Sequence, residues 1–301
     1  MADTGPRLLF ISGSPRTHTC EALIDLLEQG ARSAGAQAER FVLSKKRISP
    51  CTGCEGCRKT GTCVLADAGS VQFVDDDYLE LKALLEKVDA VALVSPLYFA
   101  GPPAQLKAVF DRFQPNWVQR YVLGYEVSVK RPAQLFVIGC GGDAHGYAPL
   151  AGIAKSALAV AGFTLEKVNN FIGFLAPCDV PDFPDEEDFD QYAQPQLVQL
   201  KRATAKQEAF VQHAIDAGSA FARYAAKKEQ ANALAEQLAA LEAELAALNA
   251  EGDDVLAPDA VIMPPRAHSV SDDPAGDAKA GIDLDYRRLI KSGTPKPETE
   301  E

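Results

Sequence analysis

Short apolar runs alternate with helical patterns along roughly the first 175 residues of the chain. Residues 7–14, RLLFISGS, read as a buried strand, and the following segment places Leu23, Leu27 and Ala31 on one helical face. The pattern predicts strands at 7–14, 38–44, 89–99, 133–142 and 164–174, and helices at 20–35, 75–88, 102–113 and 149–162. Because strands and helices alternate, we expect an α/β domain with a five-stranded parallel sheet and helices on both faces.

The pattern changes near residue 191, after which about sixty residues carry no strand signal. A leucine seam then steps by four and three residues in turn, the spacing of core positions in a coiled coil. The seam consists of Leu234, Leu238, Leu241, Leu245 and Leu248. An Ala/Leu-rich helix of this kind can instead pack back on its own domain. We favour self-association, because the seam follows a complete α/β domain and is followed by a polar tail. Leucine at both core positions specifies the oligomer order poorly, so a dimer and a tetramer both stay open.

The C-terminal residues 251–301 are rich in Asp, Pro, Gly and Ala and poor in aromatic residues, which predicts a disordered acidic tail. One island within it, GIDLDYRRLI at 281–290, alternates apolar residues with charge. We expect this island to dock on a protein partner, such as the inside of a protein shell. The expected organisation is a domain at 1–190, a helix with a short coiled coil at 191–250 and a tail at 251–301.

Composition and charge narrow the classes of partner. The hydrophobic fraction of 47% in 301 residues is ordinary for a soluble globular protein. The formal net charge of −12 argues against nucleic acid or an anionic membrane as partner, because both require clustered Lys and Arg. The N-terminal stretch MADTGPRLLFISGS has no basic region before a long apolar run and no small-residue cleavage site, so we expect neither a signal peptide nor a membrane anchor. No stretch approaches about 18 apolar residues, so we expect no membrane span. The expected location is the cytoplasm, where thiols stay reduced.

Four of the seven cysteines lie in one segment, ISPCTGCEGCRKTGTC at 48–63. Cys51, Cys54, Cys57 and Cys63 follow a C-x2-C-x2-C-x5-C spacing, and such compact runs supply thiolates to iron–sulfur clusters. Structural zinc more often uses two separated pairs of ligands. We favour a [4Fe–4S] cluster over a structural or redox-active set of thiols. The other cysteines, Cys20, Cys140 and Cys178, are isolated and are expected to be small core or loop residues.

Three predicted strand ends carry residues suited to a ligand, and ligands of open α/β sheets bind at the carboxyl ends of strands. The first, SGSPRTHTC at 12–20, places hydroxyl and backbone N–H groups before a helix and adds Arg16, a bidentate donor for phosphate. A plain strand–helix turn with Thr19 as the N-cap is the alternative. The pattern is neither a P-loop nor a G-x-G-x-x-G fingerprint, so we expect neither a nucleoside triphosphate nor a dinucleotide bound in the Rossmann manner.

The second strand end, SPLYFAG at 95–101, carries aromatic residues suited to stacking on a flat ring, although they could equally fill the core. The third, GCGGDAHGY at 139–147, has glycines that let a ligand approach the backbone, with His145 and Tyr147 at its border. A phosphate loop beside aromatic and glycine loops describes a mononucleotide with a planar ring.

The motifs in this order resemble those of the flavodoxin-like NAD(P)H-dependent FMN reductases, and most closely their iron–sulfur flavoprotein branch. The motifs are LLFISGSPR, ISPCTGCEGCRKTGTCVLAD and VALVSPLYFAGPPAQLKAVFDR, with VIGCGG as a weaker fourth. The resemblance covers roughly residues 7–177. The family usually has an Asn-Thr or Asn-Ser pair after GSPR, whereas this chain has the shorter THTC.

The resemblance implies a flavodoxin-like fold that binds FMN and takes electrons from NAD(P)H or from a carrier such as ferredoxin. By this resemblance the FMN phosphate is held by Ser14, Arg16, Thr19 and Cys20. The isoalloxazine ring is flanked by Pro96, Leu97, Tyr98, Phe99 and Gly101, and its polar edge lies at Gly141 and Gly142. The same loops add Ser12, Thr17, Cys140 and Tyr147 to the expected cofactor-binding residues. No side chain is expected to act as acid or base, because the cofactor carries the chemistry.

We therefore expect an FMN-dependent oxidoreductase that passes electrons between FMN and a [4Fe–4S] cluster. The acceptor, whether quinone, ferric iron, free flavin or oxygen, is left open by the sequence. The alternative is a cluster-free FMN or ferric reductase that its tail delivers to a larger assembly.

Overall fold

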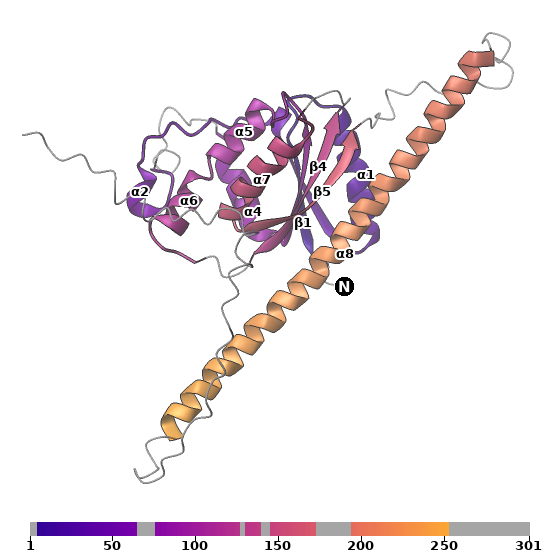
Figure 1. Cartoon of the computed structure of the whole chain (residues 1–301). Helices are drawn as coiled ribbons and strands as arrows, with labels where there is room; N and C mark the ends of the chain where they lie inside the picture. Colours follow the sequence, from indigo (N-terminus) through magenta and orange to yellow (C-terminus); the bar gives the residue numbers. More distant parts are fainter. Residues whose placement is uncertain (1–4, 65–75, 127–129, 140–144, 173–193, 253–301) are drawn as a thin grey trace, which may run out of the picture. The chain divides into compact units, whose positions relative to one another are not determined.

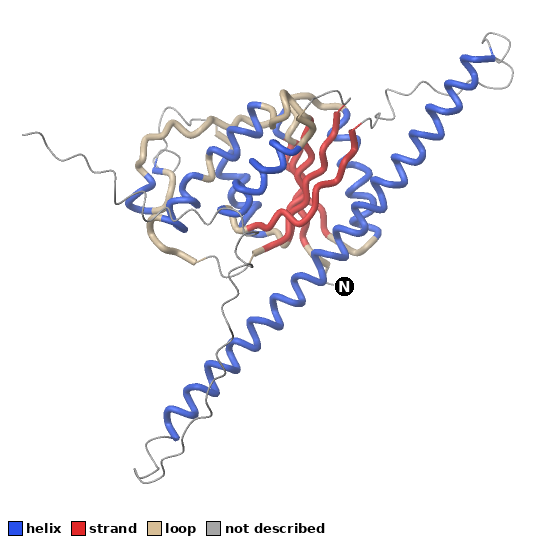
Figure 2. Tube along the Cα trace, viewed as in Figure 1, coloured by secondary structure: helices blue, strands red, loops and turns tan. Residues whose placement is uncertain are grey.

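A computed structural model describes residues 5–64, 76–126, 130–139, 145–172 and 194–252 of the chain, with side chains left undescribed at 194–205 and 248–252. Its centre is one sheet of five parallel strands in the order β2-β1-β3-β4-β5 (Figure 2). The strands are β1 Arg7–Ser12, β2 Gln37–Val42, β3 Ala90–Pro96, β4 Arg131–Gly139 and β5 Phe163–Ile172. The central strand β3 is buried at all residues but the last, as a strand covered on both faces should be. The predicted α/β fold with a five-stranded parallel sheet is confirmed.

Helices cover both faces of this sheet, with α4, α5 and α7 on one face and α1 and α8 on the other (Figure 1). The helices are α1 Thr19–Ser33, the 3-10 helix η1 Leu43–Lys45, α2 Cys57–Thr60, α4 Tyr78–Lys87, α5 Ala104–Asp111, α6 Gln114–Tyr121, α7 Ala148–Val160 and α8 Gln194–Gly252. The sequence did not predict α6. It also predicted an irregular loop throughout 48–63, where the structure has the single turn of α2, closed by Gly61 at φ 71°.

The helix α8 supplies part of the core on its face of the sheet. Its residues Ala214 and Phe221 are fully buried and belong to one cluster with Leu27 of α1 and Phe171 of β5. The helices α1 and α8 cross closely, because each presents a glycine at the contact, Gly30 and Gly218. The part of α8 that packs against the sheet extends to Ala225, which is also buried.

The chain divides into two compact units, Met1–Glu244 and Leu245–Glu301, and of the second only the end of α8 is described. The predicted boundaries near 190 and 250 stay predictions. The tail at 253–301, with the island at 281–290, lies outside the described residues. Within the described residues, no helix combines the length and the apolar character needed to cross a membrane.

Candidate functional site

The three predicted ligand loops follow β1, β3 and β4, which are neighbours in the sheet. Since the strands are parallel, their carboxyl ends meet at one edge. The chain leaves β1 for β2 on one side and returns to β3 on the other, so the first two loops flank the point where the strand order reverses. Open α/β sheets bind ligands at this switch point.

The first loop combines an orphaned hydroxyl with an uncapped helix end. Ser12 is fully buried, and its Oγ makes no hydrogen bond within the described part of the chain. Gly13 N–H donates to Val94 O at 2.7 Å, and Arg16 N–H donates to Ser14 Oγ at 3.0 Å. The helix α1 begins at Thr19, and no side chain caps it, so the alternative of Thr19 as an N-cap is wrong. Its first N–H groups are therefore available to an anion.

Cys20 of this loop is a core thiol. Its side chain is 3% exposed and belongs to the same core cluster as Leu23 and Phe10. Burial raises the pKa of Cys20 to about 12, and a hydrogen bond with Ser14 opposes this only in part. The Cys20 thiol is therefore neutral and almost fully buried.

The second loop is a tight turn held in a strained conformation. Tyr98 and Gly101 exchange two backbone hydrogen bonds of 3.0 Å, and the residues between them, Phe99 and Ala100, have φ values of 52° and 61°. Ala100 is buried, and its carbonyl oxygen accepts a hydrogen bond from Leu150 N of α7 at 3.1 Å. Phe99 is fully exposed. Left-handed residues other than Gly are costly and cluster at functional loops.

A hydrogen bond joins these two loops. Arg16 Nη2 donates to Tyr98 Oη at 3.1 Å, across 82 positions of sequence. Pro96, Leu97 and Gly101 are half-buried beside them. Residues that the sequence assigned separately to a phosphate and to a ring thus come together in space.

The third loop is described only in part. Cys140, Gly141 and Gly142 lie outside the described residues. Tyr147 is half-buried and packs against the core cluster that includes Leu150. The predicted contacts of this loop stay predictions.

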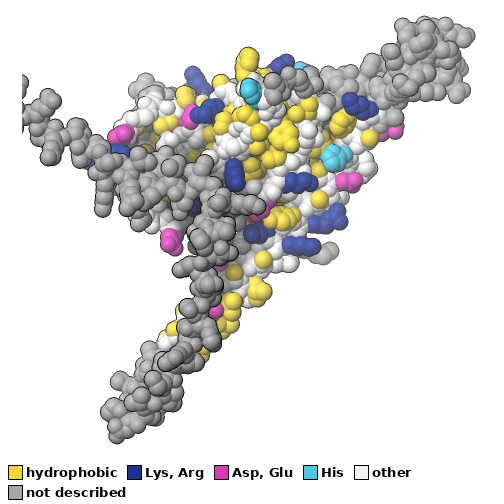
Figure 3. Space-filling view, viewed as in Figure 1, with side chains coloured by type: hydrophobic (Ala, Val, Ile, Leu, Met, Phe, Trp, Pro, Cys, Tyr) yellow, Lys and Arg dark blue, Asp and Glu magenta, His cyan; other side chains and the backbone are white. Residues whose placement is uncertain are grey.

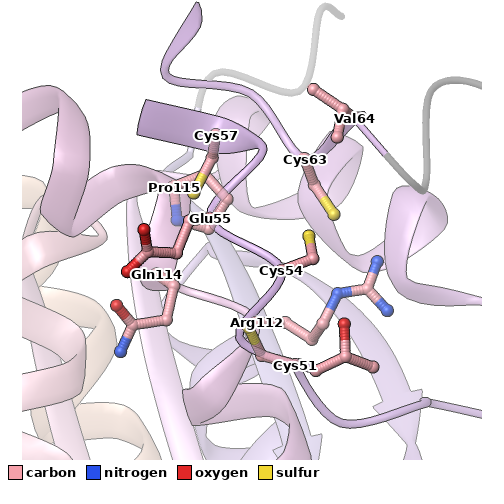
Figure 4. Close-up of a pocket in the computed structure, with 10 residues that line it drawn as sticks. Cys51, Cys54, Glu55, Cys57, Cys63, Val64, Arg112, Gln114 and Pro115 are labelled. Atoms are coloured by element: carbon pink, nitrogen blue, oxygen red, sulfur yellow. The ribbon is translucent and has the colours of Figure 1, made fainter. Parts of the chain in front are cut away.

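The four clustered cysteines line one open pocket (Figure 4). Its volume of about 370 Å³ includes space that is open to solvent. In Figure 4 the side chains of Cys54 and Cys63 point toward one another. Burial raises the pKa of Cys57, and the three other thiols raise it further. Gly53 N–H donates to Cys51 Sγ at 3.5 Å. None of the described residues of the three loops lines this pocket.

The thiols do not form a site for a single metal ion. The five described cysteines are free, which sets aside disulfides among them. Within the described residues, no group of three His, Cys, Asp or Glu side chains is placed to hold one ion. A tetrahedral zinc needs its sulfurs within about 2.3 Å of one point. In a [4Fe–4S] cluster each thiolate binds a different iron, and the sulfurs stand further apart.

A buried ion pair that the sequence did not predict holds the cysteine segment. Arg112 Nη1 lies 2.7 Å from Asp76 Oδ2 and donates to Ser49 O at 3.1 Å, while Ser49 N–H donates to the same carboxylate at 3.1 Å. The guanidinium also lies over the Tyr78 ring at 4.1 Å, and Tyr78 Oη donates to Arg112 O at 2.7 Å. Burial raises the pKa of Tyr78, although Arg112 opposes this, so its hydroxyl stays a donor. Arg112 itself lines the cysteine pocket.

The chain is similar to known flavin proteins. The sequence model of a family described as NADPH-dependent FMN reductase matches residues 6–167. An iron–sulfur flavoprotein of Methanosarcina thermophila is 34% identical over 107 residues, which is 35% of this chain and 51% of that protein. One from Archaeoglobus fulgidus is 37% identical over 106 residues, or 35% and 44%. The chain thus spans about half the length of the curated relatives it matches.

Solved structures with a similar arrangement include a flavone reductase, with a TM-score of 0.45 and 16% identity over 73% of this chain and 62% of that chain. An NAD(P)H:quinone oxidoreductase from Methanothermobacter marburgensis has a TM-score of 0.41 and 18% identity, with coverage of 72% and 96%.

Proposed function

The chain belongs to the NADPH-dependent FMN reductase family, and on that premise we propose that it binds FMN and transfers electrons from NAD(P)H to an acceptor. The observation that carries this proposal is the meeting of two predicted ligand loops at the switch point, where Arg16 of one contacts Tyr98 of the other. When bound, FMN supplies two-electron acceptance and one-electron release.

The first loop suits the phosphate of FMN. The start of α1 offers uncapped N–H groups, and Arg16 adds a positive charge beside them. Ser12 and Ser14 are buried hydroxyls at the base of the same loop, and the unpartnered Oγ of Ser12 favours a ligand there. We propose that these groups, with Thr17, Thr19 and the backbone of Cys20, hold the phosphate.

The second and third loops would orient the ring. We propose that the turn from Pro96 to Gly101 flanks it, with Phe99 available for contact because the chain itself does not bury that side chain. Gly141 and Gly142 would lie at the polar edge, with Cys140 and Tyr147 nearby. No acid or base is assigned, since the residues bind and orient while the cofactor reacts.

The identity of the flavin tests this proposal. Flavin released by acid from purified protein, reconstituted if needed, should be FMN at about one per chain, because the loops offer one phosphate site and no pyrophosphate fingerprint. The bound flavin should be bleached by NADPH or NADH. Stoichiometric FAD, or no flavin after reconstitution, would overturn it.

We further propose that Cys51, Cys54, Cys57 and Cys63 hold a [4Fe–4S] cluster, which would exchange single electrons with the flavin. Four thiols around one pocket support this, as do the curated relatives named iron–sulfur flavoproteins. The N–H that Gly53 directs at Cys51 Sγ would favour a charged sulfur. Arg112, at the wall of the pocket, would offset the negative charge of four thiolates.

The cluster is tested separately from the flavin. Anaerobically prepared, iron-replete protein should hold about four iron and four sulfide per chain, with broad absorption that dithionite bleaches. Cys54→Ser should lose the iron and keep FMN, since Cys54 lies outside the three loops. Protein with the flavin spectrum alone would favour the second candidate, a cluster-free FMN or ferric reductase whose thiols are structural or redox-active.

The remaining predictions concern partners and location. We propose that the chain works in the cytoplasm, since clustered free thiols suit a reducing compartment. Docking of the island at 281–290 on a partner or shell stays a proposal that a deletion of residues 278–301 would test by co-purification. The division of the chain at 190 and 250 also stays a proposal.

A further inference from the structure

The leucine seam of α8 is exposed in the chain. Leu234, Leu238, Leu241 and Leu245 keep 67%, 57%, 62% and 59% of their surface. All residues from 229 to 247 are exposed except the half-buried Asn232. Figure 3 shows hydrophobic side chains at the surface along the C-terminal part of α8. The alternative that the seam packs back on its own domain is therefore wrong for these four residues.

The seam lies on the side of the helix away from the domain. The stripe that enters the core runs through Ala214, Phe221 and Ala225. Leu234 is nine residues beyond Ala225, and at about 100° per residue that places it about 180° around the helix. A straight α8 therefore cannot bury both stripes against the same domain, so a second protein surface is needed to cover the leucines.

The charges that flank the seam indicate which surface this is. With the leucines at core positions, the flanking residues include Lys228 near the start of the exposed segment and Glu242 and Glu244 near its end. Glu229 and Glu236 fall on the outer face. The seam of one helix thus has a basic end and an acidic end. Two such helices have complementary charges when they run in opposite directions.

We propose that α8 pairs with α8 of a second copy of this chain as an antiparallel coiled coil. In the register centred on Glu236, Leu234 faces the partner's Leu238, and Lys228 faces the partner's Glu242. The two-fold axis repeats both contacts. A parallel pair instead brings together the acidic ends of both helices, and like charges at a seam are unfavourable. The proposal does not depend on the flavin or on the cluster.

Photo-crosslinking in the full-length chain tests the orientation. A benzophenone-bearing phenylalanine replaces Gln230, which flanks the seam. The antiparallel pair should give a covalent dimer whose linked peptide lies C-terminal to Leu238 of the partner. A link near residue 230 of the partner would show a parallel pair, and no covalent dimer would overturn the seam as an interface. Leu238→Asp with Leu241→Asp should abolish the dimer while flavin content and helicity are retained.

A charge-swap cycle provides a second, independent readout. Lys228→Glu, and separately Glu242→Lys, should each lower the yield of covalent dimer by about fivefold or more, because like charges then face one another. The two substitutions together should restore the yield. The same charge change on exposed Lys82 of α4 is the control and should leave it unchanged. Equal yields across the cycle would overturn the antiparallel assignment.

Discussion

At the scale of single residues, Arg16 contributes most directly to the proposed phosphate site. Its guanidinium reaches Tyr98 of the neighbouring loop, so it stands between the two parts of the proposed cofactor site. Arg16→Ala should weaken FMN binding by ~1.5–3 kcal/mol through loss of a charge-assisted hydrogen bond. Flavin fluorescence during titration measures this. Arg16→Lys should recover only part of the loss, because an ammonium cannot bind phosphate in bidentate fashion. Unchanged affinity in Arg16→Ala would place the phosphate elsewhere.

Phe99 is exposed and has a positive φ, so its side chain contributes little to the stability of the folded chain. A residue other than Gly in this conformation costs roughly 1–2 kcal/mol. Phe99→Gly should therefore change the free energy of unfolding of the apo protein by about 1 kcal/mol or less, since relief of strain offsets the added freedom of the unfolded chain. The same variant should bind FMN more weakly. Urea unfolding and flavin titration separate the two effects, and equal affinity would remove Phe99 from the ring site.

Arg112 has a structural role that does not depend on any cofactor. Its side chain is 2% exposed and that of Asp76 is 4% exposed. Arg112→Met should lower the free energy of unfolding by ~3–5 kcal/mol, because it leaves a buried carboxylate without its cation. Adding Asp76→Leu should recover part of the loss. Lys107→Met, which breaks an exposed pair with Asp111, is the control and should cost about 0–1 kcal/mol. Urea denaturation of metal-free protein measures all three, and an equal effect from both single variants would contradict this role.

At the scale of elements, the sequence predicted the strands and helices whose hydrophobic pattern is long and regular. The strands β3 and β4 are apolar runs, and Leu23, Leu27 and Ala31 repeat at helical spacing, so burial alone determines their type. The single turn of α2 and the polar helix α6 are too short and too mixed to show a period.

The candidate site was predictable in its residue types but not in its contacts. Motifs at strand ends pointed to the first two loops, since parallel strands end at one edge. The ion pair of Arg112 with Asp76 spans 36 positions, and no local pattern encodes such a contact. Similarly, the leucine spacing predicted a seam, whereas only the path of α8 shows which stripe of that helix the domain uses.

The crossing of α1 and α8 depends on two glycines. An added Cβ would lie 1.9 Å from Ile215 O at Gly30 and 2.0 Å from Leu27 O at Gly218, and both neighbours are backbone atoms that cannot move alone. Gly30→Ala and Gly218→Ala should each destabilise the protein by ~1–3 kcal/mol and loosen α8. Denaturant unfolding and limited proteolysis of α8 measure this.

Gly152 of α7 is the matched control, because nothing lies within 4 Å of its added Cβ. Gly152→Ala should stabilise the protein by ~0.5–1 kcal/mol through helix propensity. Equal changes in stability from the three Gly→Ala substitutions would show that the close crossing of α1 and α8 does not contribute to stability.

At the scale of the whole molecule, α8 connects the fold to the proposed assembly. Its segment up to Ala225 completes one face of the core, and the leucine seam beyond it is free for a second copy. The proposed site draws on loops of β1, β3 and β4, which span the centre of the sheet, while the cysteine pocket lies among α2, the turn after α5 and the start of α6. Flavin binding, cluster binding and pairing are thus assigned to different residues and can be tested one at a time.

Because the proposed FMN site joins loops of three strands, the ligand should stabilise the domain as a unit. A ligand that binds only the folded state raises the free energy of unfolding by about 2.7 kcal/mol when its free concentration is about 100 times its Kd. For a domain of this size each kcal/mol raises Tm by about 2–4 °C. Thermal unfolding of apo protein should therefore shift upward with FMN. Riboflavin has the same ring without the phosphate, and at equal free concentration it should give a clearly smaller shift. Arg16→Ala should narrow the difference between the two flavins, since the phosphate then contributes less. Equal shifts with both flavins in the unmodified chain would mean that the loop before α1 does not bind the phosphate.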